Sequence, residues 1–258
     1  MKTIMFRIVP GVFIVLLLNA LINCRVYSQS PKADRLSEDR IYTFSTNTVG
    51  TGPELEIVFI SGEEHNHPLM AIWVEDTLGN YLQTLYVAKS IATGIFKYGD
   101  NSSGKWSEGE IRRPAALPYW AHQRGIKTED GLYMPTPGQP VPDAYTGATP
   151  KSDFILDTRL DEKGPGVFNV LLEINQSWDW NEYWTNTKYP DNEEYKTSSQ
   201  PAVVYRATID LNRGINEFPM ELAGHSHYAG ENGQLYPDTS TLTTALQIAG
   251  EIIVKVKK

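Results

Sequence analysis

The chain has 258 residues, a formal net charge of −8 and 41% hydrophobic residues. This length fits one large or two small domains and is sufficient for a substantial hydrophobic core. The acidic balance argues against a nucleic acid or an anionic membrane as a partner, because both would require a basic surface.

The N-terminal residues predict a secretory signal peptide over residues 1–28. Lys2 and Arg7 precede an apolar run over residues 8–22, which a proline and a glycine interrupt. A basic start followed by a short, broken apolar run is typical of a signal peptide and is too short for a comfortable membrane span. We expect cleavage after Ser28, which makes the mature protein periplasmic or secreted.

A lipoprotein site competes with this cleavage site. Cys24 follows an apolar segment, as in a lipoprotein box, but Asn23 stands where a small residue is usual. Cleavage after Ser28 instead removes the only cysteine, so the mature chain has neither a disulfide nor a thiol nucleophile. We therefore expect a single secreted domain over residues 29–258, held together by its core alone.

Removing the three basic residues of the leader changes the net charge to −11.

The first half of the mature chain predicts strands. Short apolar or β-prone runs cover residues 41–44, 55–60, 70–74 and 81–87. Between the last two runs, residues 76–80 read Asp-Thr-Leu-Gly-Asn, which favours a hairpin turn. This hairpin resembles part of the immunoglobulin-like module of flagellar hook-capping proteins. The resemblance implies a β-sandwich and implies nothing about flagella.

Residues 89–150 predict a long loop. Residues 97–109 are rich in glycine and serine, and a short helix is expected to start within residues 112–118 and to end near Arg124. Trp120 and Arg124 are candidate pocket residues, because a flat conjugated ring prefers an aromatic partner and a nearby cation. The alternative is a buried Trp120 that packs the loop, with Arg124 paired to an acid.

The end of this loop carries the most specific motif of the chain. Its fixed positions, in the pattern Asp-x-x-(Ser/Thr)-Gly-Ala-Thr, are filled by Asp143, Thr146, Gly147, Ala148 and Thr149. The pattern resembles the acceptor motif of proteins that carry flavin mononucleotide (FMN) through a phosphoester bond to threonine. Small residues leave space beside Thr149, and the side chains of Asp143 and Thr146 can shape the turn through local hydrogen bonds. The same residues also suit an ordinary capped turn between two strands.

The resemblance implies a function for the protein. FMN would be attached to Thr149 by a separate flavin transferase, in a step that depends on positioning and charge neutralisation. Trp120 and Arg124 would cover the flavin ring. The protein would then be an extracytoplasmic electron carrier rather than an enzyme, with a membrane redox protein as a candidate partner.

The second half of the chain returns to strands. They are predicted at residues 154–157, 167–175, 202–211 and 248–256. A helical turn is expected within residues 239–247, capped by Asp238 or Ser240. With at least seven strands separated by turns, we predict an all-β fold. It is an antiparallel immunoglobulin-like β-sandwich with at most short helices and with long loops at residues 89–150 and 176–200.

The second of these loops offers an alternative function. Trp178, Trp180 and Trp184 lie among acids and amides, and such residues can form a sugar-binding platform because pyranose faces stack on indole rings. The protein would then be a non-enzymatic binding module for a glycan or an envelope partner, and the segment around Thr149 would be a structural turn. The loop could instead fold its aromatic side chains onto the sheet, in which case they would serve packing and not binding.

Other chemistry has little support in the sequence. The pairs His65/His67 and His225/His227 could each place two imidazoles on one strand face, but no carboxylate cluster accompanies them at a familiar spacing. The sequence contains no Gly-x-Ser-x-Gly elbow, phosphate loop or dinucleotide fingerprint. We therefore expect no metal site.

Across its mature length the chain also resembles a family of secreted bacterial proteins known as domain of unknown function 2271. The resemblance rests on Trp73, Tyr81–Tyr86, Arg113–Arg124, Asp143–Pro150, Glu173–Asn175 and Gly224–Gly233. Members of this family are periplasmic proteins, and some are linked to flavin-transfer and membrane redox components. The resemblance implies the same compartment and supports FMN attachment by association.

Overall fold

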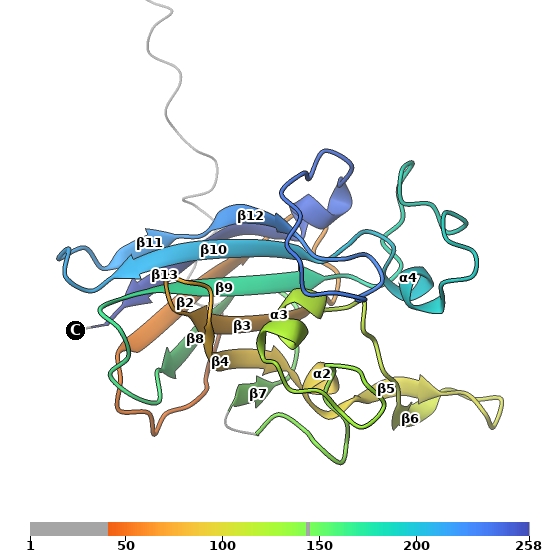
Figure 1. Cartoon of the computed structure of the whole chain (residues 1–258), viewed down its shortest axis with the longest axis horizontal. Coiled ribbons are helices and arrows are strands. Elements are labelled where there is room, and N and C mark those ends of the chain that lie inside the picture. Colours follow the sequence, from red (N-terminus) through yellow and green to blue (C-terminus); the bar gives the residue numbers. More distant parts are fainter. Residues whose placement is uncertain (1–40, 143–144, 258) are drawn as a thin grey trace, which may run out of the picture. The chain divides into compact units, whose positions relative to one another are not determined.

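The computed structural model describes residues 41–142 and 145–257, which lie in one compact unit that begins at Ile41. Most of the regular structure in this unit is β-strand, arranged in two large sheets (Figure 1). The predicted signal peptide and both cleavage sites lie outside the described residues, as do Asp143 and Ala144.

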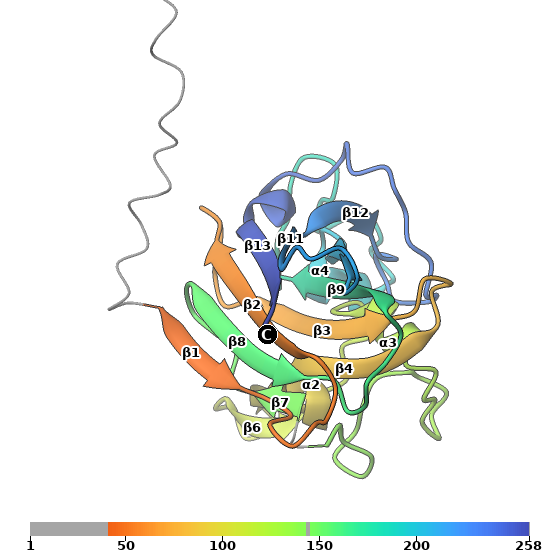
Figure 2. The same ribbon diagram turned by 90° about the vertical axis from the view of Figure 1, so that its left-hand side faces the viewer.

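The two large sheets pack as the layers of a β-sandwich (Figure 2). The first has five strands in the order β1 (Tyr42–Ser45), β8 (Phe154–Arg159), β2 (Glu54–Ser61), β13 (Ala249–Val256) and β11 (Glu217–Pro219). The second has six strands in the order β12 (Glu221–His225), β10 (Val203–Asp210), β9 (Val167–Asn175), β3 (Leu69–Glu75), β4 (Tyr81–Ala88) and β7 (Thr146–Gly147). The predicted all-β sandwich is thus confirmed, and its likeness to an immunoglobulin fold stays a prediction.

Most neighbouring strands are antiparallel, as predicted, but two edge strands pair in parallel. The hairpin of β3 and β4 lies where the turn over residues 76–80 placed it. By contrast, β1 is parallel to β8, and β7 is parallel to β4. Parallel neighbours cannot be joined by a tight turn, so a long stretch of chain separates β1 from β8 and β4 from β7. The stretch after β4 leads to the motif, whose Thr146 and Gly147 form β7.

The inner core fills the space between the sheets. Alternate residues of β9, namely Phe168, Val170, Leu172 and Ile174, are fully buried and belong to this core. Alternate side chains of a strand point to the same face, so the period of two in the sequence predicts this burial. Burying each such side chain contributes about 1.5–3 kcal/mol.

A second core covers the outer face of the six-stranded sheet. Ala71 and Trp73 of β3 point away from the inner core and pack under α2 (Lys89–Thr93) and α3 (Pro118–Gln123), two short helices that lie over the sheet in Figure 1. β3 is therefore buried along its whole length. Much of the segment predicted as a long loop forms a packed layer, because the sheet offers it a second apolar face.

Part of this segment differs from the prediction. Residues 97–109 form most of a hairpin of β5 (Ile95–Asp100) and β6 (Ser107–Glu110) instead of a loop. Gly104 has a φ of +78° at the turn between the two strands, a conformation that glycine adopts without strain. Phe96 of β5 packs against the second core, but most side chains of the hairpin are polar or exposed, so the hydrophobic pattern does not reveal it.

The remaining helices are short. α3 ends at Gln123 with Arg124 as its C-cap, as predicted. The helical turn near the C-terminus is a 3₁₀ helix, η4 (Thr244–Gln247), and its N-cap is Thr243 rather than either of the two predicted caps. Asp238 instead accepts a hydrogen bond from the Ser240 amide within its own turn. α4 (Glu193–Ser198) lies in the loop over residues 176–200 and is capped by the side chain of Asn192.

Candidate functional site

The motif forms the edge strand β7 and the loop that follows it. Thr146 and Gly147 pair in parallel register with β4. The chain then passes from the six-stranded sheet to β8 in the five-stranded sheet. Thr149 is half-buried in this crossover, and Ala148 beside it is exposed. The proposed acceptor residue therefore lies on a fixed connection at the edge of the sandwich.

Tyr86 of β4 holds the motif from the inside. Its hydroxyl donates a hydrogen bond to the Ala148 carbonyl at 2.9 Å. A Cβ atom added at Gly147 would lie 3.0 Å from Cε2 of Tyr86, so glycine allows the strand to approach the ring. Burial raises the pKa of the Tyr86 hydroxyl far above its ordinary value, which keeps it protonated and able to donate.

Two further aromatic residues continue this contact to the surface. The same added Cβ at Gly147 would lie 3.9 Å from Cε2 of Phe44. The Phe44 ring lies 5.3 Å from the Tyr86 ring, and it also stacks on Tyr42 at 5.3 Å with an interplanar angle of 23°. Tyr42 is 51% exposed. These three residues form an aromatic row from the surface to the base of the motif. The sequence does not reveal the row, because Tyr42 and Phe44 lie in one predicted strand and Tyr86 in another.

Pro150 fixes the other side of Thr149. It is buried, and its carbonyl acts together with that of Ile248 on the ring of His65, whose Nδ1 lies 3.3 Å from the Ile248 oxygen. Burial lowers the pKa of His65, while the two carbonyls and the charge of Asp153 act in the opposite direction. Thr149 therefore stands between two anchored neighbours.

Trp120 and Arg124, the predicted cover of a flavin ring, contact each other. Trp120 is fully buried, and its Nε1 donates a hydrogen bond to Oγ1 of Thr84 at 3.0 Å. The Arg124 guanidinium lies 4.8 Å from the centroid of the indole, and burial lowers the pKa of Arg124. This geometry favours the alternative in which Trp120 packs the core. Arg124 contacts the indole face and the side chain of Tyr81, rather than the acid of that alternative.

A buried carboxylate supports the helix that carries Trp120. Glu173 of β9 accepts hydrogen bonds from the amides of Tyr119 at 3.1 Å and Trp120 at 2.8 Å. Burial raises its pKa to about 7, while these two amides and the Ser226 hydroxyl act in the opposite direction. The first amides of a helix have no partner within the helix, so Glu173 satisfies two of them in α3. The sequence does not reveal this link between distant residues.

The loop over residues 176–200 exposes only part of the predicted platform. Trp178 and Trp180 are 62% and 45% exposed, but Trp184 is only 6% exposed. The third tryptophan is therefore not part of an exposed platform. The neighbouring Tyr183, which is 51% exposed, is the third large aromatic residue of this surface.

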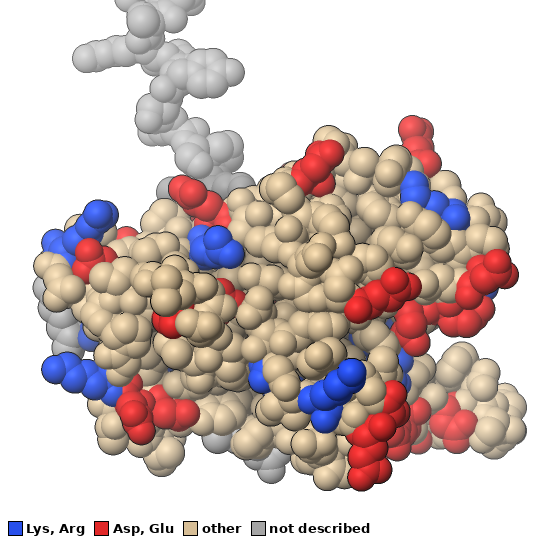
Figure 3. Space-filling view, viewed as in Figure 1, with Lys and Arg blue, Asp and Glu red and all other residues tan. Residues whose placement is uncertain are grey.

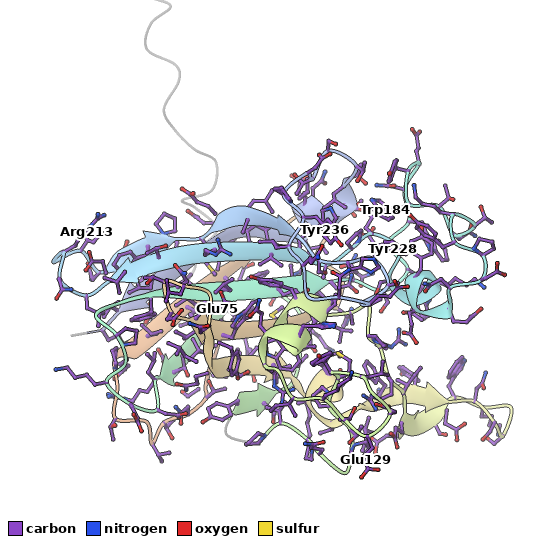
Figure 4. The ribbon with its side chains drawn as sticks, in the orientation of Figure 1. Glu75, Glu129, Trp184, Arg213, Tyr228 and Tyr236 are labelled. Carbon is purple, nitrogen blue, oxygen red and sulfur yellow. The ribbon has the colours of Figure 1, made fainter. Side chains whose placement is uncertain are left out.

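Trp184 instead anchors the loop on the rest of the protein. Its Nε1 donates a hydrogen bond to Oγ1 of Thr241 at 3.1 Å, and its ring lies 6.0 Å from that of Tyr228 (Figure 4). Tyr228 also stacks on Tyr189 at 4.2 Å with an interplanar angle of 6°. This packed aromatic cluster fixes the base of the loop.

Three of the four histidines in the two pairs contact aromatic rings, and His65 lies 5.6 Å from the ring of Phe59. His225 stacks on Tyr236 at 5.4 Å, and His227 stacks on Tyr228 at 4.4 Å. His67 is exposed, and its Nδ1 lies 3.0 Å from the Asn66 side chain. Among residues 41–142 and 145–257, no group of three histidine, cysteine or acidic side chains is placed to hold a metal ion.

No family model, curated protein or solved structure matches the chain. In the part of the chain that the structure describes, no helix combines the length and the apolar character needed to cross a membrane.

Proposed function

We propose that the protein carries FMN as a phosphoester on Thr149 and acts as an extracytoplasmic electron carrier. The observation that supports this most is the position of the motif. Thr149 is half-buried in an edge crossover, directly after the exposed Ala148 and beside an aromatic row that reaches the surface. In the attachment step, Oγ1 of Thr149 bonds to the FMN phosphorus of flavin adenine dinucleotide. The hydroxyl proton is lost and adenosine monophosphate leaves.

The aromatic row that meets the motif at Gly147 fits a flat ring better than the residues first predicted. Trp120 is buried and already covered by Arg124, whereas Tyr42 is exposed and stacked on Phe44. Aromatic rings gain from offset stacking on a second ring. FMN, when bound, would supply the electron chemistry, and the chain would supply attachment and an aromatic surface. We therefore assign Tyr42, in place of Trp120, as the side chain against which the ring lies.

Co-expression with a flavin transferase in the periplasm tests the attachment. Intact-mass measurement of the wild-type protein should show one added FMN minus water, with flavin fluorescence that survives a denaturing gel. Thr149→Ala should gain nothing. Thr146→Ser is the matched control, because the motif allows serine at that position, and it should be labelled as the wild type is.

The comparison requires a known acceptor in the same cells. If that acceptor is labelled while the folded wild-type protein gains no mass, the motif is a structural turn and the proposal is wrong. Labelling of Thr149→Ala to the wild-type level would also contradict it, because the flavin would then be attached elsewhere.

A further inference from the structure

The loop over residues 176–200 presents three large aromatic side chains to solvent within six positions. Trp178, Trp180 and Tyr183 are all at least 45% exposed. Large apolar side chains are normally buried, because each square ångström of apolar surface left in water costs about 25 cal/mol. A cluster of exposed aromatic residues on an otherwise well-packed protein marks a binding surface.

The backbone beneath these side chains is held in one conformation by Asn181. Its Oδ1 accepts hydrogen bonds from the amides of Tyr183 at 2.9 Å and Trp184 at 2.7 Å. Its Nδ2 donates to the Thr241 carbonyl at 2.9 Å and to Oε1 of Gln200 at 3.2 Å. The exposed rings therefore project from a rigid support, and little conformational entropy is lost when a ligand binds them.

Trp178 has a strained backbone that keeps its side chain outside. Its φ is +59°, in the left-handed region that residues with a Cβ avoid at a cost of about 1–2 kcal/mol. The Trp178 amide donates to the Thr197 carbonyl at 3.1 Å, and the Asp179 amide donates to the Ser198 carbonyl at 3.2 Å. The end of α4 thus holds this conformation. Such strain is concentrated at functional positions.

The charges around the aromatic surface select against anionic ligands. Glu182, Asp191 and Glu193 are exposed, and acidic side chains gather at this end of the molecule (Figure 3). The two lysines of the loop are already engaged. Nζ of Lys188 lies 3.2 Å from the centroid of the Tyr183 ring, and Nζ of Lys196 lies 2.7 Å from Glu193. These surroundings therefore favour a neutral ligand over an anionic one.

We infer that Trp178, Trp180 and Tyr183 form a binding surface for chains of neutral sugars. A pyranose ring has an apolar face that stacks on an aromatic ring and an equatorial rim of hydroxyls that need polar partners. The surface offers both, since the exposed Glu182 lies between the aromatic residues in the sequence. This inference does not depend on the proposed flavin attachment, which concerns β7 and the following loop.

Titration of the full-length mature protein with cellohexaose, hexa-N-acetylchitohexaose and maltohexaose tests the inference, with tryptophan fluorescence and calorimetry as readouts. We expect at least one of these neutral sugars to bind. Trp178→Ala, Trp180→Ala and Tyr183→Ala should each weaken binding about tenfold or more, as expected for an aromatic side chain in the contact. Trp106→Ala is the matched control, because Trp106 is 63% exposed and lies beside β6.

Three results would overturn the inference. The first is the absence of a response to all three sugars at millimolar concentration. The second is a loss of affinity in Trp106→Ala equal to that in the loop variants. The third is equally tight binding of polygalacturonate, since the acidic surroundings should repel it. Circular dichroism of each variant distinguishes lost contacts from lost folding.

Discussion

At the scale of single residues, the position of Tyr42 explains how the edge of the sandwich could support a ring. Its side chain is 51% exposed and its ring stacks on Phe44, and Phe44 lies close to Gly147 in the motif. Trp120 has the more favourable ring for stacking, but the structure uses it inside the second core. Exposure, not residue type, therefore decides which aromatic residue is available to a ligand.

Tyr42→Ala should change the environment of a flavin attached to Thr149. A phenol in contact with an excited flavin quenches it by donating an electron, so both Tyr42→Ala and Tyr42→Phe should increase flavin fluorescence. Tyr98→Ala is the control, because Tyr98 is 60% exposed on the hairpin of β5 and β6. Full labelling by mass with unchanged fluorescence in both Tyr42 variants would place the ring elsewhere and leave the attachment itself intact.

The backbone of Trp178 gives a second prediction at this scale. Glycine adopts a φ of +59° without strain, whereas alanine does not. Trp178→Gly should therefore be more stable than Trp178→Ala by about 1 kcal/mol, although both lack the indole and both should lose sugar binding. Urea unfolding of the two variants measures the difference. Equal stabilities would show that the loop relaxes and that no strain is held there.

The sequence predicts the chemistry of single residues better than their exposure. The motif around Thr149 is complete in the sequence, and three tryptophans predict an aromatic surface. The sequence does not show that Trp184 and Trp120 are buried, because both depend on contacts with strands far away in the chain. The Trp184 indole donates a hydrogen bond to Thr241. The Trp120 indole donates one to Thr84, and the Trp120 amide donates one to Glu173.

At the scale of elements, α3 depends on a residue outside it. The helix has only six residues and no side-chain cap of its own, so it is too short to be stable alone. Glu173 of β9 accepts two of its first amides from beneath. A carboxylate at the N-terminus of a helix is favourable, but this carboxylate is fully buried, and burial is the larger effect on its pKa.

The raised pKa of Glu173 predicts a dependence of stability on pH. Its pKa is about 7 in the folded protein, compared with an ordinary value of 4.5, so the folded state binds more protons between these values. The stabilisation is complete below pH 4.5 and is lost as the pH rises through about 7. The whole effect corresponds to about 3 kcal/mol, at about 1.4 kcal/mol for each pKa unit.

Glu173→Gln provides the comparison, because glutamine has a similar shape and does not titrate. Urea unfolding at pH 5, 6, 7 and 8 should show that the wild-type protein loses free energy of unfolding relative to the variant as the pH rises. A difference that stays constant over this range would show that Glu173 remains ionised and that its two amide hydrogen bonds outweigh burial.

The elements that the sequence predicts are those with a strong hydrophobic pattern. The strands β1, β2, β3, β4, β8, β9, β10 and β13 all coincide with predicted apolar or β-prone runs within one or two residues. The strands β5, β6, β7, β11 and β12 are short or polar, and they are formed by pairing with a neighbour rather than by their own pattern. β7 contains only two residues of the motif, so its existence depends on β4 beside it.

At the scale of the whole molecule, two cores share the same strands. Ile72 of β3 lies in the inner core and Trp73 in the outer one, and Leu172 and Leu171 of β9 divide in the same way. The six-stranded sheet is therefore the middle layer, and the packed segment that contains α2 and α3 is its second cover. The continuous apolar run in β3 is the sequence signal of this arrangement, because a strand with one solvated face would alternate. β9 does not give this signal, since Asn169, Glu173 and Asn175 alternate with its apolar residues.

Because the cores share strands, the molecule should unfold in a single step. Leu172→Ala in the inner core should lower the free energy of unfolding by about 2–5 kcal/mol, and Trp120→Ala in the outer core by about 3–5 kcal/mol. In both variants, far-ultraviolet circular dichroism and tryptophan fluorescence should follow the same transition in urea. If Trp120→Ala instead loses its near-ultraviolet signal at low urea while the strand signal persists, the outer layer unfolds on its own. The segment that leads to Thr149 would then be able to detach from an intact sandwich.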